Sequence, residues 1–336
     1  ILAGVKVTSG GDITLTAVSV LGAISLEQSG SLVVDGNSTV PGISIKESGD
    51  LTIGTFASSG EVLVEKSGDV DVNGSVASIL SKESGGIRLT DARVFPGGVT
   101  MALSSGALEI CGTEIGVNSD TQTDGSGGVY VLEGGDVLAV ADESCSPSEI
   151  EGAVIVKKGT GDVRFAGAAL NSDLIVSEQV GHVEVDGSGC DPLDPPCATV
   201  SDVLVQKSTG DITLRSVTTD SDTTIKDNDG NVTVDSSTLG SDVRIQFNGW
   251  VELTNNSFSL EDVLISGNDG PVLIDRNCEM RLSITENDDV TITNNNAEDA
   301  AAAGAVCTSG FGFTDADVTK NTGGVLIESN TGEGLF

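Results

Sequence analysis

The sequence predicts an all-β fold: a right-handed parallel β-helix, or β-solenoid, of about fifteen rungs with four loop excursions. The main observation is that residues 202–221 are followed by a second segment, residues 222–241, with the same layout. In each segment, two short runs of alternating apolar residues flank a polar turn that ends in glycine. Alternation of period two is typical of strands, and a repeat near twenty residues identifies a solenoid. So short a unit can bury its apolar face only against copies of itself.

The turn glycine provides a ruler for the rungs. Successive markers are 17 to 21 residues apart in the regular parts of the chain, and the spacing lengthens at the excursions. A left-handed β-helix repeats a strict hexapeptide, so this drift favours the right-handed form. The markers are Gly11, Gly30, Gly49, Gly68, Gly85, Gly106, Gly135, Gly161, Gly181, Gly210, Gly230, Gly249, Gly270, Asp288 in the glycine slot, and Gly323.

Each regular rung is expected to contain two strands around the marker. Ile43 and Ile45 precede Gly49, for example, and Leu51 and Ile53 follow it. Polar residues should stack from rung to rung, and stacked asparagines can hydrogen-bond along the axis of such a stack. We therefore predict a structural role for the asparagines that gather in the last third, which are Asn255, Asn256, Asn277, Asn294, Asn295 and Asn296.

Four segments interrupt the period: residues 113–127, 142–152, 187–199 and 294–317. Loops that project from a rigid stack are where repeat folds usually carry function. The alanine-rich residues 297–305 are expected to form one or two helical turns. Because a solenoid grows by adding rungs, we predict a single domain over residues 1–336.

The composition excludes several classes of partner. The formal net charge is −35, and a nucleic-acid-binding protein needs a basic face to neutralise phosphates. No run of about 18 apolar residues is present, so we predict no membrane insertion. The chain opens at Ile1 without a methionine or an export signal, which indicates a processed protein or an excerpt.

The six cysteines lie in or near the excursions. They allow fifteen connectivities, but only sequential pairing avoids bridging distant rungs, and disulfides indicate an oxidising compartment. A metal site is not predicted, since no C-x-x-C pair or cysteine–histidine pair is present. The predicted disulfides are Cys111–Cys145, Cys190–Cys197 and Cys278–Cys307. Four N-x-S/T sequons would permit glycosylation in a eukaryote, at Asn37, Asn73, Asn231 and Asn255.

The periodicity resembles that of the right-handed parallel β-helix (pectate lyase-like) superfamily, which includes carbohydrate enzymes, phage tailspikes and bacterial surface proteins. Polygalacturonase-like members carry N-T-D, D-D, G-H-G and R-I-K motifs. Here Asp288–Asp289 is the only D-D pair and the only candidate acid pair, His182 stands in G-H-V, and no R-I-K follows. The likeness is therefore one of fold.

Lyase-like members need acidic calcium ligands with an arginine or lysine base beside them. Arg276 and Arg281 lie about one rung from Asp288 and Asp289, so these four residues are the candidate catalytic set. The alternative interpretation is surface ion pairs. Sugar-binding grooves also use exposed aromatic residues, and the chain has one Trp and one Tyr. We therefore expect no catalysis and no cofactor, beyond calcium held loosely by acidic turns.

Two unusual residues remain. His182 takes a turn position held by Asp or Gly in other rungs, and we interpret it as solvent-facing. Trp250 follows Gly249 at the same slot and indicates either an exposed apolar residue or a contact patch.

We expect an extracellular or cell-surface protein with a structural or adhesive role. Neither end of the sequence resembles a cap, so either the chain is an excerpt of a longer solenoid or, as we favour, copies associate end to end into a filament. A surface polysaccharide is a second possible partner. The alternative is a polysaccharide-acting β-helix enzyme, either a lyase or a glycoside hydrolase.

Overall fold

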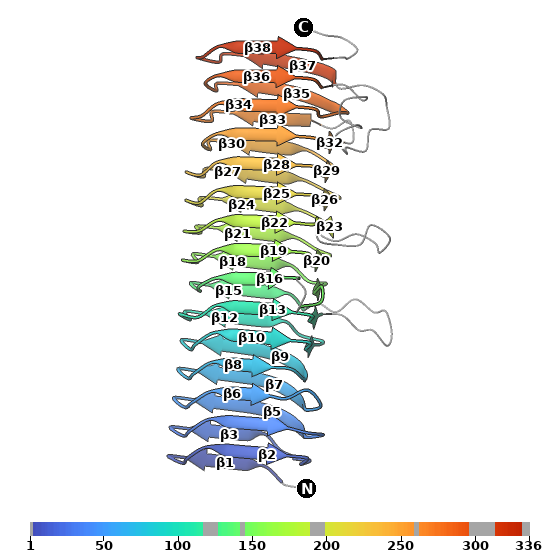
Figure 1. Ribbon diagram of the computed structural model, residues 1–336. Coiled ribbons are helices and arrows are strands. Elements are labelled where there is room, and N and C mark those ends of the chain that lie inside the picture. Colours follow the sequence, from blue (N-terminus) through green and yellow to red (C-terminus); the bar gives the residue numbers. More distant parts are fainter. Residues whose placement is uncertain are drawn as a thin grey trace. The chain divides into compact units, whose positions relative to one another are not determined.

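The computed structural model describes residues 3–116, 127–141, 145–188, 199–258, 262–295 and 313–330. The chain divides into two compact units, Ile1–Ser172 (unit 1) and Asp173–Phe336 (unit 2). Within each unit the strands stack in sequence order (Figure 1), and all the registered pairings in the described residues are parallel. The predicted all-β parallel solenoid is thus confirmed, and no helix occurs in the part of the chain that the structure describes.

Unit 1 contains two long sheets. Strands before the turn glycine form the first, which comprises β1 (Val5–Thr8), β3 (Ile24–Glu27), β5 (Thr39–Lys46), β7 (Ser58–Glu65), β9 (Ser75–Lys82), β12 (Val99–Ala102), β15 (Val129–Leu132) and β18 (Val154–Lys157). Strands after it form the second, which comprises β2 (Ile13–Thr16), β4 (Leu32–Asp35), β6 (Leu51–Ile53), β8 (Val70–Val72), β10 (Ile87–Thr90), β13 (Leu108–Cys111), β16 (Val137–Val140) and β19 (Val163–Ala166).

Unit 2 repeats this arrangement. Its first sheet comprises β21 (Leu174–Ser177), β24 (Val203–Gln206), β27 (Thr223–Lys226), β30 (Val243–Gln246), β33 (Asp262–Ser266), β35 (Met280–Thr285) and β37 (Phe313–Thr319). Its second comprises β22 (Val183–Asp186), β25 (Ile212–Arg215), β28 (Val232–Asp235), β31 (Val251–Thr254), β34 (Val272–Asp275), β36 (Val290–Thr293) and β38 (Val325–Glu328). Together the units contribute about as many rungs as the spacing of the turn glycines predicts.

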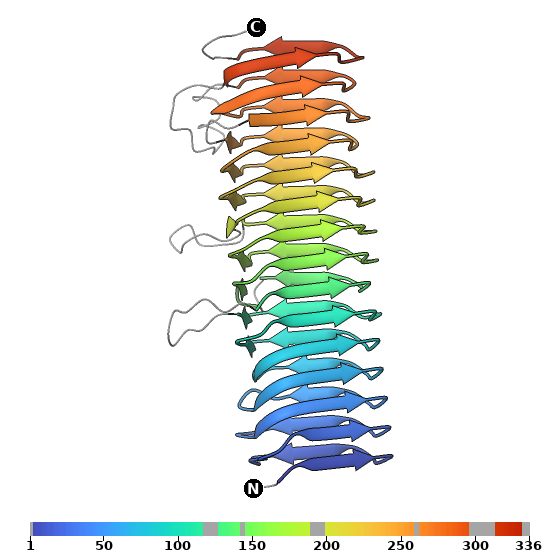
Figure 2. The same cartoon turned by 180° about the vertical axis from the view of Figure 1, so that it is seen from behind.

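Short strands of two residues form a third side in parts of both units (Figure 2). In unit 1 they are β11 (Arg93–Val94), β14 (Glu114–Ile115), β17 (Glu149–Ile150) and β20 (Ala169–Leu170). In unit 2 they are β23 (Thr199–Val200), β26 (Thr218–Thr219), β29 (Thr238–Leu239) and β32 (Ser257–Phe258). β14, β17 and the start of β37 fall inside segments predicted as excursions, so the excursions are shorter than expected. Residues 297–305 lie outside the described residues.

The core lies between the sheets and consists of the alternate residues of every strand. Leu51 and Ile53 of β6 are fully buried, and Thr52 between them is not. Leu51 pairs with Leu32 on one side and with Val70 on the other. Identical positions in successive rungs therefore stack on one another, as the period-two pattern predicts.

The turn glycine is required because successive rungs approach closely. A Cβ atom on Gly230 would lie 2.0 Å from the carbonyl oxygen of Gly210, one rung away. The left-handed backbone conformation falls instead on the residue just after the first-sheet strand, such as Lys207 with a φ of 55° or Asp227 with a φ of 56°. Close packing of backbone on backbone thus explains the marker glycines better than positive φ does.

Two buried polar ladders run along the corners of unit 2. At the corner after the first sheet, Asn248 donates its backbone N–H to Oδ1 of Asn268 (2.9 Å) and its Nδ2 to the same oxygen (3.1 Å). Asn268 repeats this contact with Asn287. Unit 1 has serine at the equivalent positions, and Ser48 donates its backbone N–H to Oγ of Ser67 (3.2 Å).

The second ladder lies at the corner after the second sheet and contains Asn256, Asn277 and Asn295, all fully buried. Their structural role is as expected. Asn255 and Asn294 lie in the left-handed position of the same corners and donate their Nδ2 to Asp235 and Asp275 of the preceding rung. Asn296 lies outside the described residues.

Candidate functional site

A groove lies on the outer face of the first sheet of unit 2. It has a volume of about 460 Å³ and crosses β30, β33, β35 and β37. Because alternate residues of a strand face outward, the four strands place charged side chains side by side. The polar lining residues are Asp242, Arg244, Asp262, Arg281, Ser283, Asp315 and Asp317.

The arginines of this groove are held in ion pairs between neighbouring strands. Nε of Arg281 lies 3.0 Å from Oδ1 of Asp262. Arg244 contacts Asp242, and its Nη1 lies 3.4 Å from Oδ2 of Asp222. These carboxylates fix the guanidinium groups against the sheet, so the groove is an ordered polar surface.

The structure separates the four candidate catalytic residues into two places. Arg276 and Arg281 flank the start of β35, whereas Asp288 and Asp289 follow its end. Arg281 is the second residue of β35, so four residues of extended strand, roughly 13 Å, separate it from the corner that carries the two aspartates. The aspartates also have local contacts, since Asp289 accepts the backbone N–H of Gly324 (2.6 Å) and Asp288 accepts the hydroxyl of Thr322 (3.4 Å).

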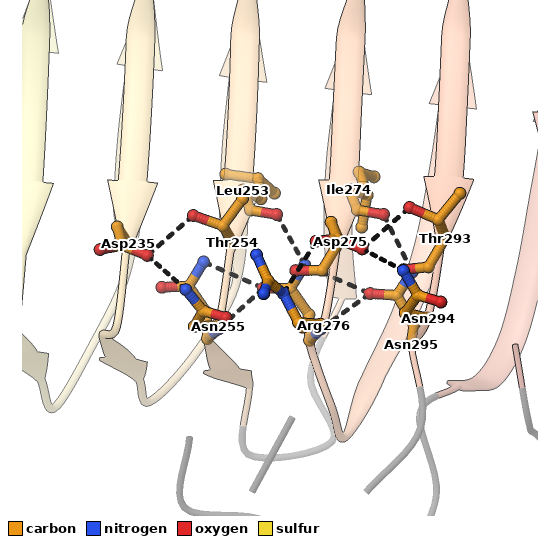
Figure 3. Close-up of polar contacts among 12 residues, drawn as sticks. Asp235, Leu253, Thr254, Asn255, Ile274, Asp275, Arg276, Thr293, Asn294 and Asn295 are labelled. Carbon is orange, nitrogen blue, oxygen red and sulfur yellow. Dashed lines mark hydrogen bonds and ion pairs between the residues drawn. The ribbon is translucent and has the colours of Figure 1, made fainter. Parts of the chain in front are cut away.

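Arg276 belongs to a repeated corner motif (Figure 3). Oδ1 of Asp275 accepts the hydroxyl of Thr293 (2.9 Å) and Nδ2 of Asn294 (2.9 Å) from the next rung, while Nε of Arg276 lies 2.8 Å from Oδ2. The interpretation of Arg276 as part of a surface ion pair accounts for these contacts.

Two rungs earlier, Asp235 accepts Thr254 (2.8 Å) and Asn255 (2.8 Å) in the same way. Each carboxylate therefore clamps one rung to the next, which is a structural function.

Unit 1 has a smaller groove of about 240 Å³ on its second sheet, lined in part by Asp71, Arg88 and Glu109. Nε of Arg88 lies 2.7 Å from Oε2 of Glu109, and Nη1 lies 3.7 Å from Oδ1 of Asp71. The hydrogen bond to Glu109, with the negative charges of both acids, raises the pKa of Arg88 above its usual value. An ion-pair network therefore lines this groove too.

A carboxylate pair in unit 1 was not predicted. Nδ2 of Asn171 donates to Oε1 of Glu149 (3.2 Å) and to Oε1 of Glu151 (2.7 Å). Partial burial, followed by the nearby charge of Glu151, raises the pKa of Glu149. Both glutamates lie in a segment predicted as an excursion, where no periodic signal indicates which side chains meet.

The cysteines and sequons are only partly described. Cys111 and Cys145 form a disulfide with their Cα atoms 5.3 Å apart, and Cys278 is also disulfide-bonded. Cys190, Cys197 and Cys307 lie outside the described residues.

Among the sequons, Asn37, Asn73 and Asn231 are exposed, while Asn255 is half-buried and donates to Asp235. His182 is exposed and accepts the backbone N–H of Asp211 at Nδ1 (3.1 Å).

In the described ranges no three His, Cys, Asp or Glu side chains are grouped so that they could hold a metal ion. The same part of the chain contains no helical segment with the length and apolarity needed to cross a bilayer.

Comparison with protein families matches residues 147–333, more than half of the chain, to Toastrack DUF4097. No match was found among curated proteins or among solved structures.

Proposed function

The chain belongs to the Toastrack DUF4097 family, and we propose that this member is an extracellular or cell-surface solenoid with a structural or adhesive role. The observation that carries the proposal is that the arginine side chains of unit 2 are engaged in ion pairs with neighbouring aspartates. The arginines Arg244, Arg276 and Arg281 are each paired with an aspartate on their own or an adjacent strand. Contacts of this kind stiffen a surface, whereas catalysis needs charged groups that are aimed at a substrate.

The extracellular location is supported by chemistry rather than by a targeting signal. The Cys111–Cys145 disulfide needs an oxidising compartment to persist. A net charge of −35 also keeps a strand-rich surface soluble and discourages edge-to-edge pairing. Peptide mapping of the secreted protein without reduction tests this part, and finding the six cysteines as free thiols would overturn it.

End-to-end stacking is the finer part of the proposal. In β38, Val325 is 49% exposed although its counterpart in β36, Val290, is buried. A second copy that adds its strands to β37 and β38 would cover this surface with parallel pairing of the kind already present. Light scattering and electron microscopy over a concentration series test the idea, because a strictly monomeric particle at the highest concentration contradicts it.

The alternative, a polysaccharide-acting enzyme, is supported by one observation, the charged groove over β30–β37. The deciding experiment incubates the protein with a panel of acidic polysaccharides, with and without calcium, and measures new reducing ends and unsaturated products. The structural role predicts neither product. If products appear, Asp262→Asn with Arg281→Gln tests the groove, and Asp288→Asn with Asp289→Asn serves as the comparison outside it.

A further inference from the structure

Two exposed aromatic side chains share one corner of unit 2. Phe247 is 58% exposed and Trp250 is 40% exposed, and both lie between β30 and β31. Aromatic residues make up only 3% of the chain, and Trp250 is its single tryptophan. At the slot of Phe247, the rung before has Asp227, the rung after has Gly267, and the following rung has Glu286. Solenoid packing therefore does not require aromatic residues at this corner.

The corner is also one residue shorter than those on either side of it. Three residues, 248–250, separate Phe247 from β31, whereas four follow Asp227 and four follow Gly267 before the next strand. The ladder aligns Asn228, Asn248 and Asn268, so the additional residues of the neighbouring corners are Asp229 and Asp269. Both are exposed, and they lie two rungs apart, which is about 10 Å. The shorter corner is therefore flanked by one exposed carboxylate on each side.

The Phe247 ring lies over the next rung, where a glycine makes room for it. A Cβ atom on Gly267 would lie 2.6 Å from Cε1 and 2.7 Å from Cδ1 of this ring. Gly267 is the one glycine among the described left-handed residues that follow first-sheet strands in unit 2. Phe247 itself has a φ of 55°, an uncommon conformation for a bulky residue.

A second shortened corner in the same unit provides an internal comparison. Three residues separate Glu286 from β36, and the exposed side chains there are charged. Oε1 of Glu286 lies 3.5 Å from Nζ of Lys320. Shortening a corner thus carries no need for aromatic side chains, so those at residues 247 and 250 have another cause.

An aromatic surface flanked by carboxylates is the chemistry that recognises organic cations, because the ring face and the carboxylates both attract positive charge. We propose that the corner formed by Phe247 and Trp250, with Asp229 and Asp269 beside it, binds an alkylated ammonium ion. The net charge of −35 raises the local concentration of such cations near the surface. The site is separate from the groove over β30–β37 and does not depend on the structural role proposed above.

Trp250 makes the test specific, since intrinsic tryptophan fluorescence reports this corner alone. The protein is titrated at low salt with choline, with its uncharged isostere 3,3-dimethyl-1-butanol, and with cellobiose. We expect a saturable change with choline in roughly the millimolar range for an exposed site, and none with the other two. No response to choline, an equal response to the isostere, or saturation by cellobiose would each overturn the proposal.

Variants separate recognition from general effects. Phe247→Ser should weaken choline binding by about three- to fivefold, the size of one exposed cation–π contact. The double change Asp229→Asn with Asp269→Asn should weaken it without altering either ring. Leu103→Ser is the matched control, because Leu103 occupies the same left-handed slot in unit 1 and is 44% exposed. Equal losses in Leu103→Ser and Phe247→Ser, or unchanged binding in both site variants, would contradict the assignment.

Discussion

Replacing Asn277 should show how much of the stability of unit 2 comes from its buried ladders. Oδ1 of Asn277 accepts the backbone N–H of Asn256 (2.8 Å) and its Nδ2 (3.0 Å). Nδ2 of Asn277 donates to the carbonyl of Leu253 (2.7 Å). The side chain is fully buried, so no water replaces these partners in Asn277→Leu.

The expected loss follows from the groups left without a partner. The backbone N–H of Asn256 loses its acceptor, at a cost of about 1–3 kcal/mol, and each further hydrogen bond contributes about 1 kcal/mol net. Leucine has a similar size and recovers some hydrophobic energy. Asn277→Leu should therefore lower the free energy of unfolding by roughly 3 kcal/mol. Asn277→Ser should cost less, because a serine hydroxyl in this position can accept the N–H, as Ser67 does for Ser48.

The assay is urea denaturation combined with hydrogen exchange. The midpoint should fall in the order wild type, Asn277→Ser, Asn277→Leu, and the Asn256 amide should lose protection most strongly in Asn277→Leu. Asn231→Leu is the control on an exposed asparagine. If Asn277→Leu unfolds at the wild-type midpoint, or if serine and leucine have equal effects, the ladder does not stabilise the unit as argued.

Three further predictions concern other parts of the chain. Burial and the charge of Glu151 raise the pKa of Glu149, so the folded state binds the proton of the Glu149 carboxyl more tightly than the unfolded state does. The stability that this proton contributes is present below the ordinary pKa of a glutamate and is lost as pH rises through the raised pKa. Glu149→Gln should therefore stabilise unit 1 at neutral pH and have little effect in acid, and a melting temperature that shifts equally at both pH values would refute this assignment. Replacing both Cys111 and Cys145 by serine removes a disulfide between residues 34 apart in sequence and should lower the free energy of unfolding by roughly 3–4 kcal/mol. Denaturation with and without a reductant measures this loss. The reductant should break the Cys111–Cys145 bridge in the wild type, so it should destabilise the wild type far more than the variant. Gly230→Ala should destabilise unit 2 by more than about 2 kcal/mol, since its Cβ would lie 2.0 Å from a backbone oxygen, whereas Gly11→Ala, with nothing within 4 Å, should be nearly neutral; similar midpoints for the two would show that rung spacing adapts freely.

Much of the fold followed from local pattern. A strand such as β6 alternates apolar and polar residues, and the glycine before it recurs at a nearly constant distance. Both the strand and its register can therefore be predicted from the sequence. Leu51 pairs with Leu32 and Val70 for that reason. The two-residue strands β14 and β17 were missed because two residues cannot display a period.

The polar contacts depended on the tertiary structure. Sequence spacing placed Arg276 and Arg281 near Asp288 and Asp289, but most of the strand β35 lies between the two pairs, and the arginines contact Asp275 and Asp262 instead. Which side chains meet across rungs depends on the number of residues in each corner, and a change of one residue moves the neighbours. The repeat therefore determined that this chain is a solenoid, and the corner lengths, visible only once the rungs were stacked, decided which side chains face one another on its surface.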